Sequence, residues 1–340
     1  MRKFTVLITG VGSTTGISVI KGLRLQSEFD VRIVGVDINA ANTIAGAGMC
    51  DAFCQVPPAS DVGYVDAIAS ICRDAAVEVI FPIVDPELLA LAEHWQRFAE
   101  LGVSVIVSDA SVVRRCNDKF ATFQFMREHR IPTPETWLAS EIEDPAALPY
   151  PIFVKPRHGV SSIDAFAVQS QSEFEAARQR IPDLIAQELL VGDEFTIDVL
   201  CDFAGRAIAS TPRLRIQTKA GICTKGRTMH DESLCAWGVR IAEALGIRGP
   251  ANIQCKRNGD DVSFFEVNPR FSAGLPLTIN AGVNAPLWIL KLVDGQSRPP
   301  GLLPFHGVVM ARYWAEVFYR DADPVELIER DQGSPEDARR

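Results

Sequence analysis

Two oxygen-bearing side chains interrupt an apolar segment near the end of the chain. In FFEVNPRFSAG, residues 264–274, Glu266 and Asn268 stand two positions apart, so on a strand they point to the same face. A carboxylate among apolar neighbours is costly unless it is paired or holds a metal ion. Either these side chains bind a cation, or the segment is a solvated strand face that ends in a turn. The apolar residues expected in the core are Phe264, Phe265 and Val267.

The segment just before it supplies another oxygen ligand. ANIQCKRNGDDVSFFEVNPR contains the turn signal NGD between two strand-like runs, which predicts a hairpin. Gln254 then lies on the same face as Glu266 and Asn268. Glu266 can bridge two cations, and the amide oxygens of Gln254 and Asn268 can ligate one cation each. Mg²⁺ prefers such oxygens and completes its shell with water and nucleotide phosphates. Arg270, just past the strand, can hold a transferred phosphoryl group or an acyl phosphate.

Two lysines earlier in the chain could provide positive charge for phosphates. Lys119 lies on a predicted helix after a change of texture near residue 111, and Lys155 ends the apolar strand IFVK. The loop that follows Lys155 contains the small residues Gly159, Ser161 and Ser162, whose backbone N–H groups can approach phosphate oxygens closely. The alternative for either lysine alone is a solvated amine.

The segment AQELLVGDEF could bind the rest of a nucleotide. Free backbone groups near Glu188 and Leu190 could pair with an adenine edge, and Glu194 could accept hydrogen bonds from ribose hydroxyls. Taken alone, the same pattern describes a strand followed by a glycine turn.

A basic segment, residues 213–230, lies between these groups. It is either a solvated, charged hairpin or a flap that is poorly ordered without ligand and closes over the phosphates, because clustered positive charge repels itself until an anion binds. In the flap hypothesis Lys225 or Arg227 lies near the γ-phosphate, and Arg213 or Arg215 holds a substrate carboxylate. Arg312 could also face the site, although an arginine at a strand end is more often structural.

The glycine turn GVGSTTG, residues 10–16, offers a competing interpretation. A dinucleotide fingerprint requires G-x-G-x-x-G and an acid about 20 residues further on. Gly10, Gly12 and Asp37 suit that pattern, but Gly16 comes one residue late. A tight strand-to-helix turn requires glycine whatever it binds.

The elements that position these residues are predicted from hydrophobic patterning. The first 110 residues alternate apolar strands with helices, which indicates a parallel sheet covered on both faces. The segment SVVRRCNDKFATFQFMREHR reads as one helix, and from about residue 187 antiparallel strands predominate. The fold class is therefore α/β, becoming α+β in the second half.

Composition excludes several classes of function. The formal net charge is −9, which argues against general nucleic-acid binding. The sequence contains no apolar run long enough for a membrane span and no signal peptide at its N-terminus. Eight scattered cysteines without a C-x-x-C pair are typical of a cytoplasmic protein, which is the location we expect.

Taken together and in this order, the two lysines, QELLVGDEF and EVNPR resemble the ATP-grasp superfamily. The resemblance covers about residues 1–320 and is greatest to the ligase unit of carbamoyl-phosphate synthetase large subunits. It implies a Rossmann-like pre-ATP-grasp domain that binds no dinucleotide, followed by a two-lobed ATP-grasp domain. We expect these boundaries: residues 1–112 for the first domain, 113–186 for the small lobe, 187–320 for the large lobe with the metal site, and 321–340 for a disordered tail.

The resemblance also implies roles. Lys119 and Lys155 would contact ATP phosphates, the backbone at Glu188 and Leu190 would read adenine, and Glu194 would bind ribose. Glu266 and Asn268 would hold Mg²⁺, for which Mn²⁺ could substitute. Gln254 resembles the synthetase type, where glutamine replaces the more usual acid, and Arg270 would lie beside the acyl phosphate. The synthetases duplicate the whole unit and carry a second arginine where this chain has Ala273, so the resemblance does not extend to carbamoyl-phosphate synthesis.

The sequence therefore predicts a stand-alone ligase that uses ATP and magnesium to join a carboxylate to an amine through an acyl phosphate. We expect its partners to be small-molecule substrates, and neither nucleic acid nor a membrane. Whether the chain forms a homodimer is left open. Two alternatives remain: a nucleotide-binding regulator without catalysis, and an NAD(P)-dependent oxidoreductase.

Overall fold

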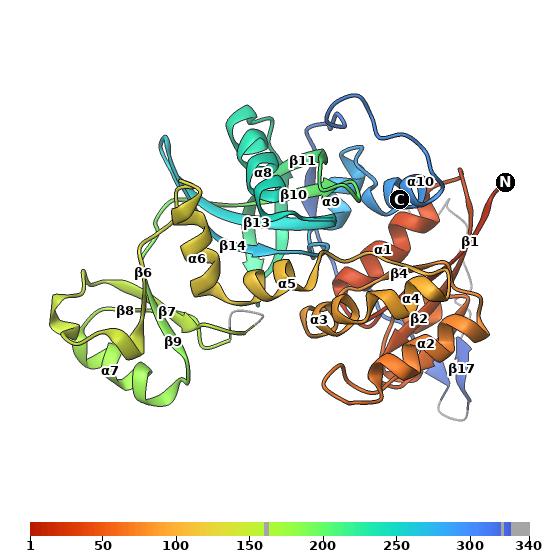
Figure 1. Cartoon of the computed structure of the whole chain (residues 1–340), viewed down its shortest axis with the longest axis horizontal. Helices are drawn as coiled ribbons and strands as arrows, with labels where there is room; N and C mark the ends of the chain where they lie inside the picture. The colour runs from red at the N-terminus through yellow and green to blue at the C-terminus, as the bar shows by residue number, and fades with distance from the viewer. Residues whose placement is uncertain (160–162, 321–322, 328–340) are drawn as a thin grey trace, which may run out of the picture.

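The computed structural model describes residues 1–159, 163–320 and 323–327. It contains a parallel α/β domain followed by two antiparallel sheets (Figure 1), which confirms the expected fold class. In the part of the chain that the structure describes, no helix is long and apolar enough to cross a membrane.

The N-terminal domain is built on a five-stranded parallel sheet in the order β3-β2-β1-β4-β5. Its helices and strands are β1 (Lys3–Ile8), α1 (Thr14–Leu25), β2 (Asp30–Asp37), β3 (Ala52–Gln55), α2 (Tyr64–Asp74), β4 (Val79–Phe81), α3 (Asp85–Glu93), α4 (Trp95–Glu100) and β5 (Ser104–Val105). Two short 3₁₀ turns, η1 (Ala41–Thr43) and η2 (Ala47–Met49), lie between β2 and β3. The central strands are buried on both faces, as parallel sheets require.

The segment after the domain forms two helices rather than the single helix expected. They are α5 (Ala110–Asn117) and α6 (Lys119–Glu128). Asp118 breaks the helix, because its backbone is extended and its side chain accepts hydrogen bonds from the N–H groups of Phe120 and Ala121, 3.0 Å each. A capping aspartate satisfies donors that a helix start leaves free, so Lys119 becomes the first residue of α6.

The small lobe, at the left of Figure 1, is a four-stranded antiparallel sheet in the order β6-β9-β7-β8. Its helices and strands are β6 (Thr136–Leu138), η3 (Ala139–Glu141), η4 (Pro145–Ala147), β7 (Ile152–Pro156), β8 (Phe166–Val168), α7 (Gln171–Arg180) and β9 (Leu184–Glu188). Helix α7 covers one face through Phe174 and Ala177, which belong to the same buried cluster as Ile152 and Val154.

The large lobe is a six-stranded sheet in the order β14-β13-β10-β11-β12-β15, and every pairing in it is antiparallel. Its helices and strands are β10 (Asp193–Cys201), β11 (Ala207–Lys219), β12 (Ile222–Thr228), α8 (Glu232–Leu245), β13 (Gly249–Asn258), β14 (Asp261–Asn268), α9 (Leu275–Asn280), α10 (Ala285–Val293) and β15 (Val309–Ala311). Helix α8 covers the face of the sheet that lies away from the polar side chains described below.

The N-terminal domain and the large lobe share a core. Leu275, Ile289 and Leu290, from the segment after β14, belong to one hydrophobic cluster with Phe4 and Val6 of β1. Burial of each such side chain stabilises the fold by about 1.5–3 kcal/mol. The shared core fixes the carboxyl ends of β1 and β4 beside the end of β14.

The end of the chain adds a small hairpin, β16 (Tyr319–Arg320) with β17 (Asp323–Leu327). The expectation of a disordered tail over residues 321–340 falls mostly on residues 321–322 and 328–340, which lie outside the described residues.

Candidate active site

A cleft of about 580 Å³ lies where the N-terminal domain and the two lobes meet. That is large enough for a nucleotide, since small-molecule sites commonly have about 300–1,000 Å³. Residues from all three parts line it. Those expected from sequence are Lys119, Lys155, Gly159, Glu188, Leu190, Glu194, Arg213, Arg215, Gln254, Glu266, Asn268 and Arg270.

The hairpin of β13 and β14 forms the polar floor of the cleft. Gln254 pairs directly with Glu266, and Asn252 pairs with Asn268. Glu266 and Asn268 thus enter the cleft side by side, as their spacing predicted. A register shift leaves Phe265 without a partner on β13, which is the mark of a β-bulge.

The bulge corrects the expectation for Phe265. Phe264 and Val267 are buried in the core of the large lobe, but Phe265 lines the cleft. The extra residue turns Phe265 to the same side as Glu266. There the Lys155 Nζ lies 5.6 Å from the centre of the Phe265 ring, close enough for a cation–π interaction.

The two lysines face this floor from the small-lobe side. Lys155 is only 6% exposed, and none of the hydrogen bonds or ion pairs found among the described residues involves its Nζ. Burial lowers the pKa of Lys155 to about 8; the charge of Glu266 opposes this, and that of Lys119 adds to it. Burial also lowers the pKa of Lys119, although Glu266 raises it. The Lys119 Nζ donates to the Gly159 carbonyl at 2.8 Å.

A single ion pair sets the spacing of these lysines. The Arg157 guanidinium donates to both oxygens of Asp118, at 2.8 and 2.6 Å, and the Lys119 N–H donates to the Arg157 carbonyl at 3.1 Å. Burial alone would raise the pKa of Asp118, but the hydrogen bonds from Arg157 and Ala121 outweigh it and lower that pKa. The start of α6 is thereby held to the loop after β7.

Arg270 is fixed by a residue of the N-terminal domain. Its Nε and one Nη each donate to Asp85 at 2.8 Å, and its other Nη donates to the Phe271 carbonyl at 3.0 Å. Burial disfavours the charge of Arg270, but the Asp85 carboxylate outweighs this and raises the pKa of Arg270. Bidentate geometry aims the guanidinium more strictly than a single contact would.

The adenine and ribose candidates line the cleft beside β13. The Lys256 Nζ donates to the Leu190 carbonyl at 3.1 Å, and Lys256 itself lines the cleft. Glu188 ends β9, and Glu194 forms an ion pair with Arg215. Lys256 lies two residues after Gln254 on the same strand, so strand periodicity could have identified it.

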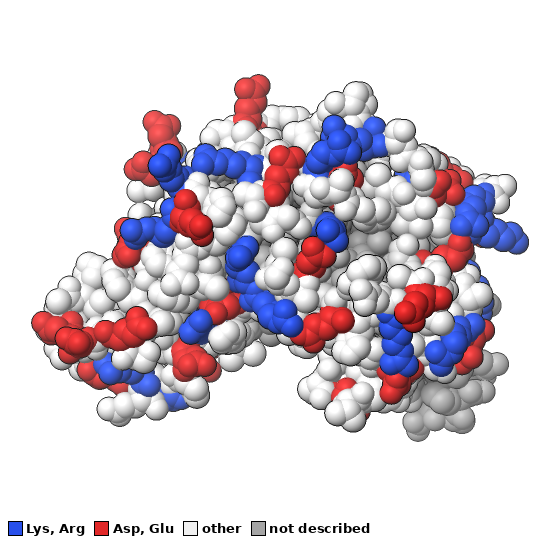
Figure 2. Space-filling view, in the orientation of Figure 1, with Lys and Arg blue, Asp and Glu red and all other residues white. Residues whose placement is uncertain are grey.

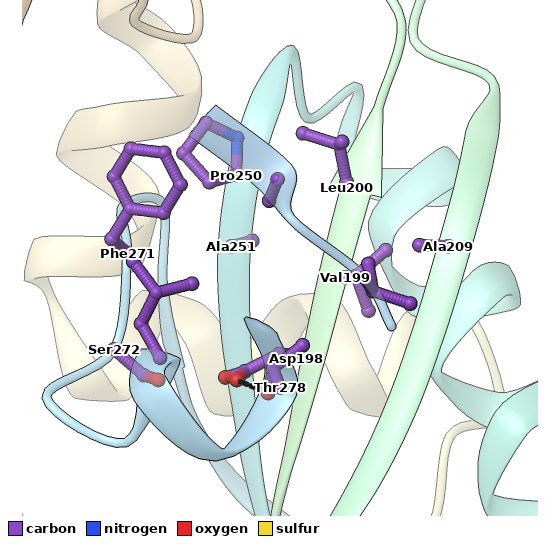
Figure 3. A pocket seen from close by; sticks show the side chains of 12 residues that line it. Asp198, Val199, Leu200, Ala209, Pro250, Ala251, Phe271, Ser272 and Thr278 are labelled. Carbon is purple, nitrogen blue, oxygen red and sulfur yellow. Dashed lines mark hydrogen bonds between the residues drawn. The ribbon is translucent and has the colours of Figure 1, made fainter. Parts of the chain in front are cut away.

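Arg213 is not free to hold a substrate carboxylate, because it already forms an ion pair with the carboxylate of Asp198. It is 1% exposed and donates to both oxygens of Asp198, at 2.9 and 2.8 Å, and to the Ser272 Oγ at 2.9 Å. Thr278 also donates to Asp198. Figure 3 shows Asp198, Thr278 and Ser272 beside a second cavity, of only about 10 Å³, whose other walls are mainly apolar. A space this small holds one water molecule at most.

The basic segment 213–230 belongs to a hairpin of β11 and β12. Register shifts on both sides of Gln217 break the alternation, and Lys225 and Arg227 are exposed and do not line the cleft. Their proposed place at the γ-phosphate after closure of the hairpin stays a prediction. Arg312 also lies outside the cleft wall and donates to the Ala273 carbonyl.

Other groups of the protein pack against the glycine turn and use its hydrogen-bonding positions. The Asp37 carboxylate accepts from the Gly12 N–H at 2.8 Å and from the backbone and side chain of Asn39. A Cβ on Gly46 would lie 1.8 Å from the Val11 carbonyl oxygen, so the segment between β2 and β3 packs directly against the turn. The carboxylate is bound within the protein and is buried, which argues against dinucleotide binding there.

Sequence reasoning missed two further features of the cleft besides Lys256. Asp85 follows strand β4, where the carboxyl ends of parallel strands gather polar residues, so its position was a usable signal. Ser13, Thr14 and Thr15 also line the cleft at the start of α1. Ser161 and Ser162 lie outside the described residues.

The floor offers hard oxygen ligands for one divalent cation. Glu266 supplies a carboxylate, and Asn268 and Gln254 supply amide oxygens, which suit Mg²⁺ together with water and phosphate. Among the residues described, no three His, Cys, Asp or Glu side chains come together as a metal site. Glu266 is the carboxylate that this floor offers to a metal ion.

The face drawn in Figure 2 shows no basic field among the described residues. Acidic and basic side chains are interspersed over the face in Figure 2, in keeping with the net charge of −9. The eight cysteines are free thiols.

Comparison with known proteins agrees with this geometry. Residues 180–313 match the family "ATP-grasp in the biosynthetic pathway with Ter operon", and residues 6–106 match the family "PylC-like, N-terminal domain". The chain is 31% identical to D-alanine--D-alanine ligase of Thermotoga petrophila over 136 residues, which are 38% of this chain and 45% of the relative. It is 23% identical to carbamoyl-phosphate synthase of Methanobrevibacter smithii over 159 residues, 45% of this chain and 43% of the relative.

The fold also resembles a solved structure, that of N5-carboxyaminoimidazole ribonucleotide synthetase in complex with ADP. The TM-score is 0.72 at 14% identity, over 91% of this chain and 81% of that one. The chain spans less than half the length of the two relatives found by sequence. By these matches residues 180–313 form an ATP-grasp domain, and residues 6–106 form a PylC-like N-terminal domain ahead of it.

Proposed function

We propose that the protein is an ATP- and divalent-metal-dependent ligase that joins a carboxylate to an amine through an acyl phosphate. One observation carries the proposal: a single cleft brings Lys155 from the small lobe, Glu266 from the large lobe and Arg270, held by Asp85 of the N-terminal domain, to one place. The match to an ATP-grasp family and the relative named D-alanine--D-alanine ligase support it.

The proposed reaction transfers the γ-phosphoryl group of ATP to an oxygen of the substrate carboxylate, and ADP leaves. The amine then attacks the carbonyl carbon, phosphate departs with the carboxylate oxygen, and the amine nitrogen loses a proton. Such phosphoryl transfer depends mainly on positioning and on neutralising charge. A divalent ion, Mg²⁺ in our proposal, would neutralise phosphate charge at Glu266 and Asn268.

Each group of the cleft has a part in this scheme. Lys119 and Lys155 neutralise the ATP phosphates from the side opposite Glu266. The backbone at Glu188 and Leu190 reads adenine, and Glu194 holds ribose. Arg270 lies past the strand that carries the metal ligands, where the transferred phosphoryl group would arrive.

The test is a screen of carboxylate–amine pairs with ATP and Mg²⁺, in which phosphate release is measured and the product is identified by mass. Glu266→Gln should abolish turnover. Asp261→Asn is the matched control, since Asp261 is exposed at the start of the same strand. Near-wild-type turnover of Glu266→Gln would contradict the proposal.

A binding experiment separates the proposal from an oxidoreductase. An ATP analogue with Mg²⁺ at 100 times its dissociation constant should add about 2.7 kcal/mol to the free energy of unfolding, and NADPH should add nothing. The intact set of Glu266, Asn268 and Arg270 favours catalysis over a purely regulatory role.

A further inference from the structure

The Arg215 guanidinium lies between the residues assigned to ribose and to metal. One Nη donates to Glu194 and, at 3.3 Å, to the Gln254 side-chain oxygen. The other Nη donates to the Gly221 carbonyl at 2.6 Å. The side chain of Arg215 is 8% exposed, against 31% for Glu194, so this cation is built into the wall of the cleft.

This placement changes what Gln254 can do. Its amide oxygen already accepts a hydrogen bond from a fixed positive charge, and a divalent ion on the same oxygen would lie beside a like charge. A second divalent ion would also need acidic ligands. Gln254 is neutral. Of the acids on the two strands beside it, Glu266 lies directly opposite and already serves the first ion, and Glu194 is paired with Arg215.

We propose that Arg215 takes the place of a second divalent cation, so that the cleft binds a nucleoside triphosphate with one divalent ion only, on Glu266 and Asn268. Gln254 then serves as an acceptor for Arg215 and is not a metal ligand. An arginine suits this role because its charge is permanent and its donors form a planar fork that matches phosphate oxygens. The inference rests on the nucleotide site of the proposed function and adds the number of its metal ions.

The contact with Gly221 explains how the guanidinium keeps its position. Gly221 lies in the tight turn between β11 and β12 and has a positive φ of 74°, a conformation that glycine adopts without strain. Arg215 is therefore held from three sides, by Glu194 on β10, Gln254 on β13 and the turn of its own hairpin.

The test counts Mn²⁺ ions bound per chain in the presence of a non-hydrolysable ATP analogue, by equilibrium dialysis with electron paramagnetic resonance. We expect one Mn²⁺ per bound analogue in the wild type, without a second even at millimolar Mn²⁺. The double variant Arg215→Ala/Gln254→Glu, which removes the guanidinium and adds a carboxylate, should bind two. Lys219→Ala, at the exposed end of the same hairpin, should still bind one.

Two Mn²⁺ per analogue in the wild type would overturn the inference while leaving the proposed function intact. Failure of the analogue to bind at all would overturn both. The wild-type count decides the matter even if the double variant does not fold, and Arg215→Lys, which keeps the charge, should retain a count of one.

Discussion

Both oxygens of the Asp85 carboxylate accept hydrogen bonds from Arg270, at 2.8 Å each. The two residues are 185 positions apart and come from different parts of the molecule: Asp85 begins α3 of the N-terminal domain, and Arg270 follows the strand that carries Glu266. The N-terminal domain, which binds no dinucleotide in our account, thus positions the arginine assigned to the transferred phosphoryl group.

Asp85→Asn should lower the turnover number and leave nucleotide affinity within about twofold. The amide cannot hold both donors of Arg270, and a small misplacement of a positioning group can cost up to about a hundredfold in rate. Turnover and dissociation constants of the ATP analogue, measured on the substrates found by the screen, check this.

Asp85→Glu should recover part of the rate, because it restores the carboxylate. The control is Asp109→Asn, which breaks an exposed ion pair with Arg248 between the same two parts of the chain and should change little. Wild-type turnover of Asp85→Asn would show that the pair only stabilises the fold.

Lys155 should make nucleotide binding depend on pH. Burial lowers its pKa to about 8, so the free protein loses this positive charge as pH rises through 8. Bound phosphates favour the charged form and raise the pKa again, so binding above pH 8 takes up a proton. Affinity for the ATP analogue with Mg²⁺ should then fall by up to about tenfold per pH unit above 8.

Calorimetry in buffers of different ionisation enthalpy measures that proton uptake directly. Lys155→Arg stays charged and should lose both the uptake and the pH dependence. If wild-type affinity is flat from pH 7 to pH 9.5, Lys155 does not contact the phosphates.

Glu87 should make the free protein less stable as pH rises. It is 4% exposed, and burial raises its pKa to about 7, although a hydrogen bond from Thr9 opposes this. Because the folded pKa exceeds the ordinary value of 4.5, the stabilisation is complete below about pH 4.5 and is lost as pH rises through 7. The loss amounts to at most about 3 kcal/mol.

Urea unfolding of Glu87→Gln at pH 5 and pH 8 tests the sign. Glutamine does not titrate, so the variant should gain stability relative to wild type between the two values. Glu93→Gln, at the exposed end of the same helix, is the control and should give no such difference. A wild-type protein more stable than Glu87→Gln by an equal margin at both values would refute the assignment.

Local pattern predicted much of this site. Strand periodicity placed Asn268 on the same face as Glu266, and the NGD turn predicted the hairpin itself. The register that starts at this turn pairs Cys255 with Phe264, so only the bulge at Phe265 brings Gln254 opposite Glu266.

What the sequence could not show depends on contacts between distant segments. The bulge at Phe265 shifts a single residue, and no turn or breaker signal in FFEVNPR requires it. The ion pair between Asp85 and Arg270 depends on the shared core, which brings β4 beside β14. Taken alone, the segment 213–230 has too many charged residues to be expected in a packed sheet. The carboxylates that neutralise Arg213 and Arg215 lie on β10, outside the segment, so its own sequence does not reveal them.

The central claim is that a carboxylate is activated as an acyl phosphate. The most direct measurement uses a substrate carboxylate labelled with ¹⁸O at both oxygens, with mass analysis of the phosphate and of the condensed product. Our account predicts one labelled oxygen in the phosphate and one in the product, with ADP as the other product. Unlabelled phosphate, or release of AMP and diphosphate, would contradict it.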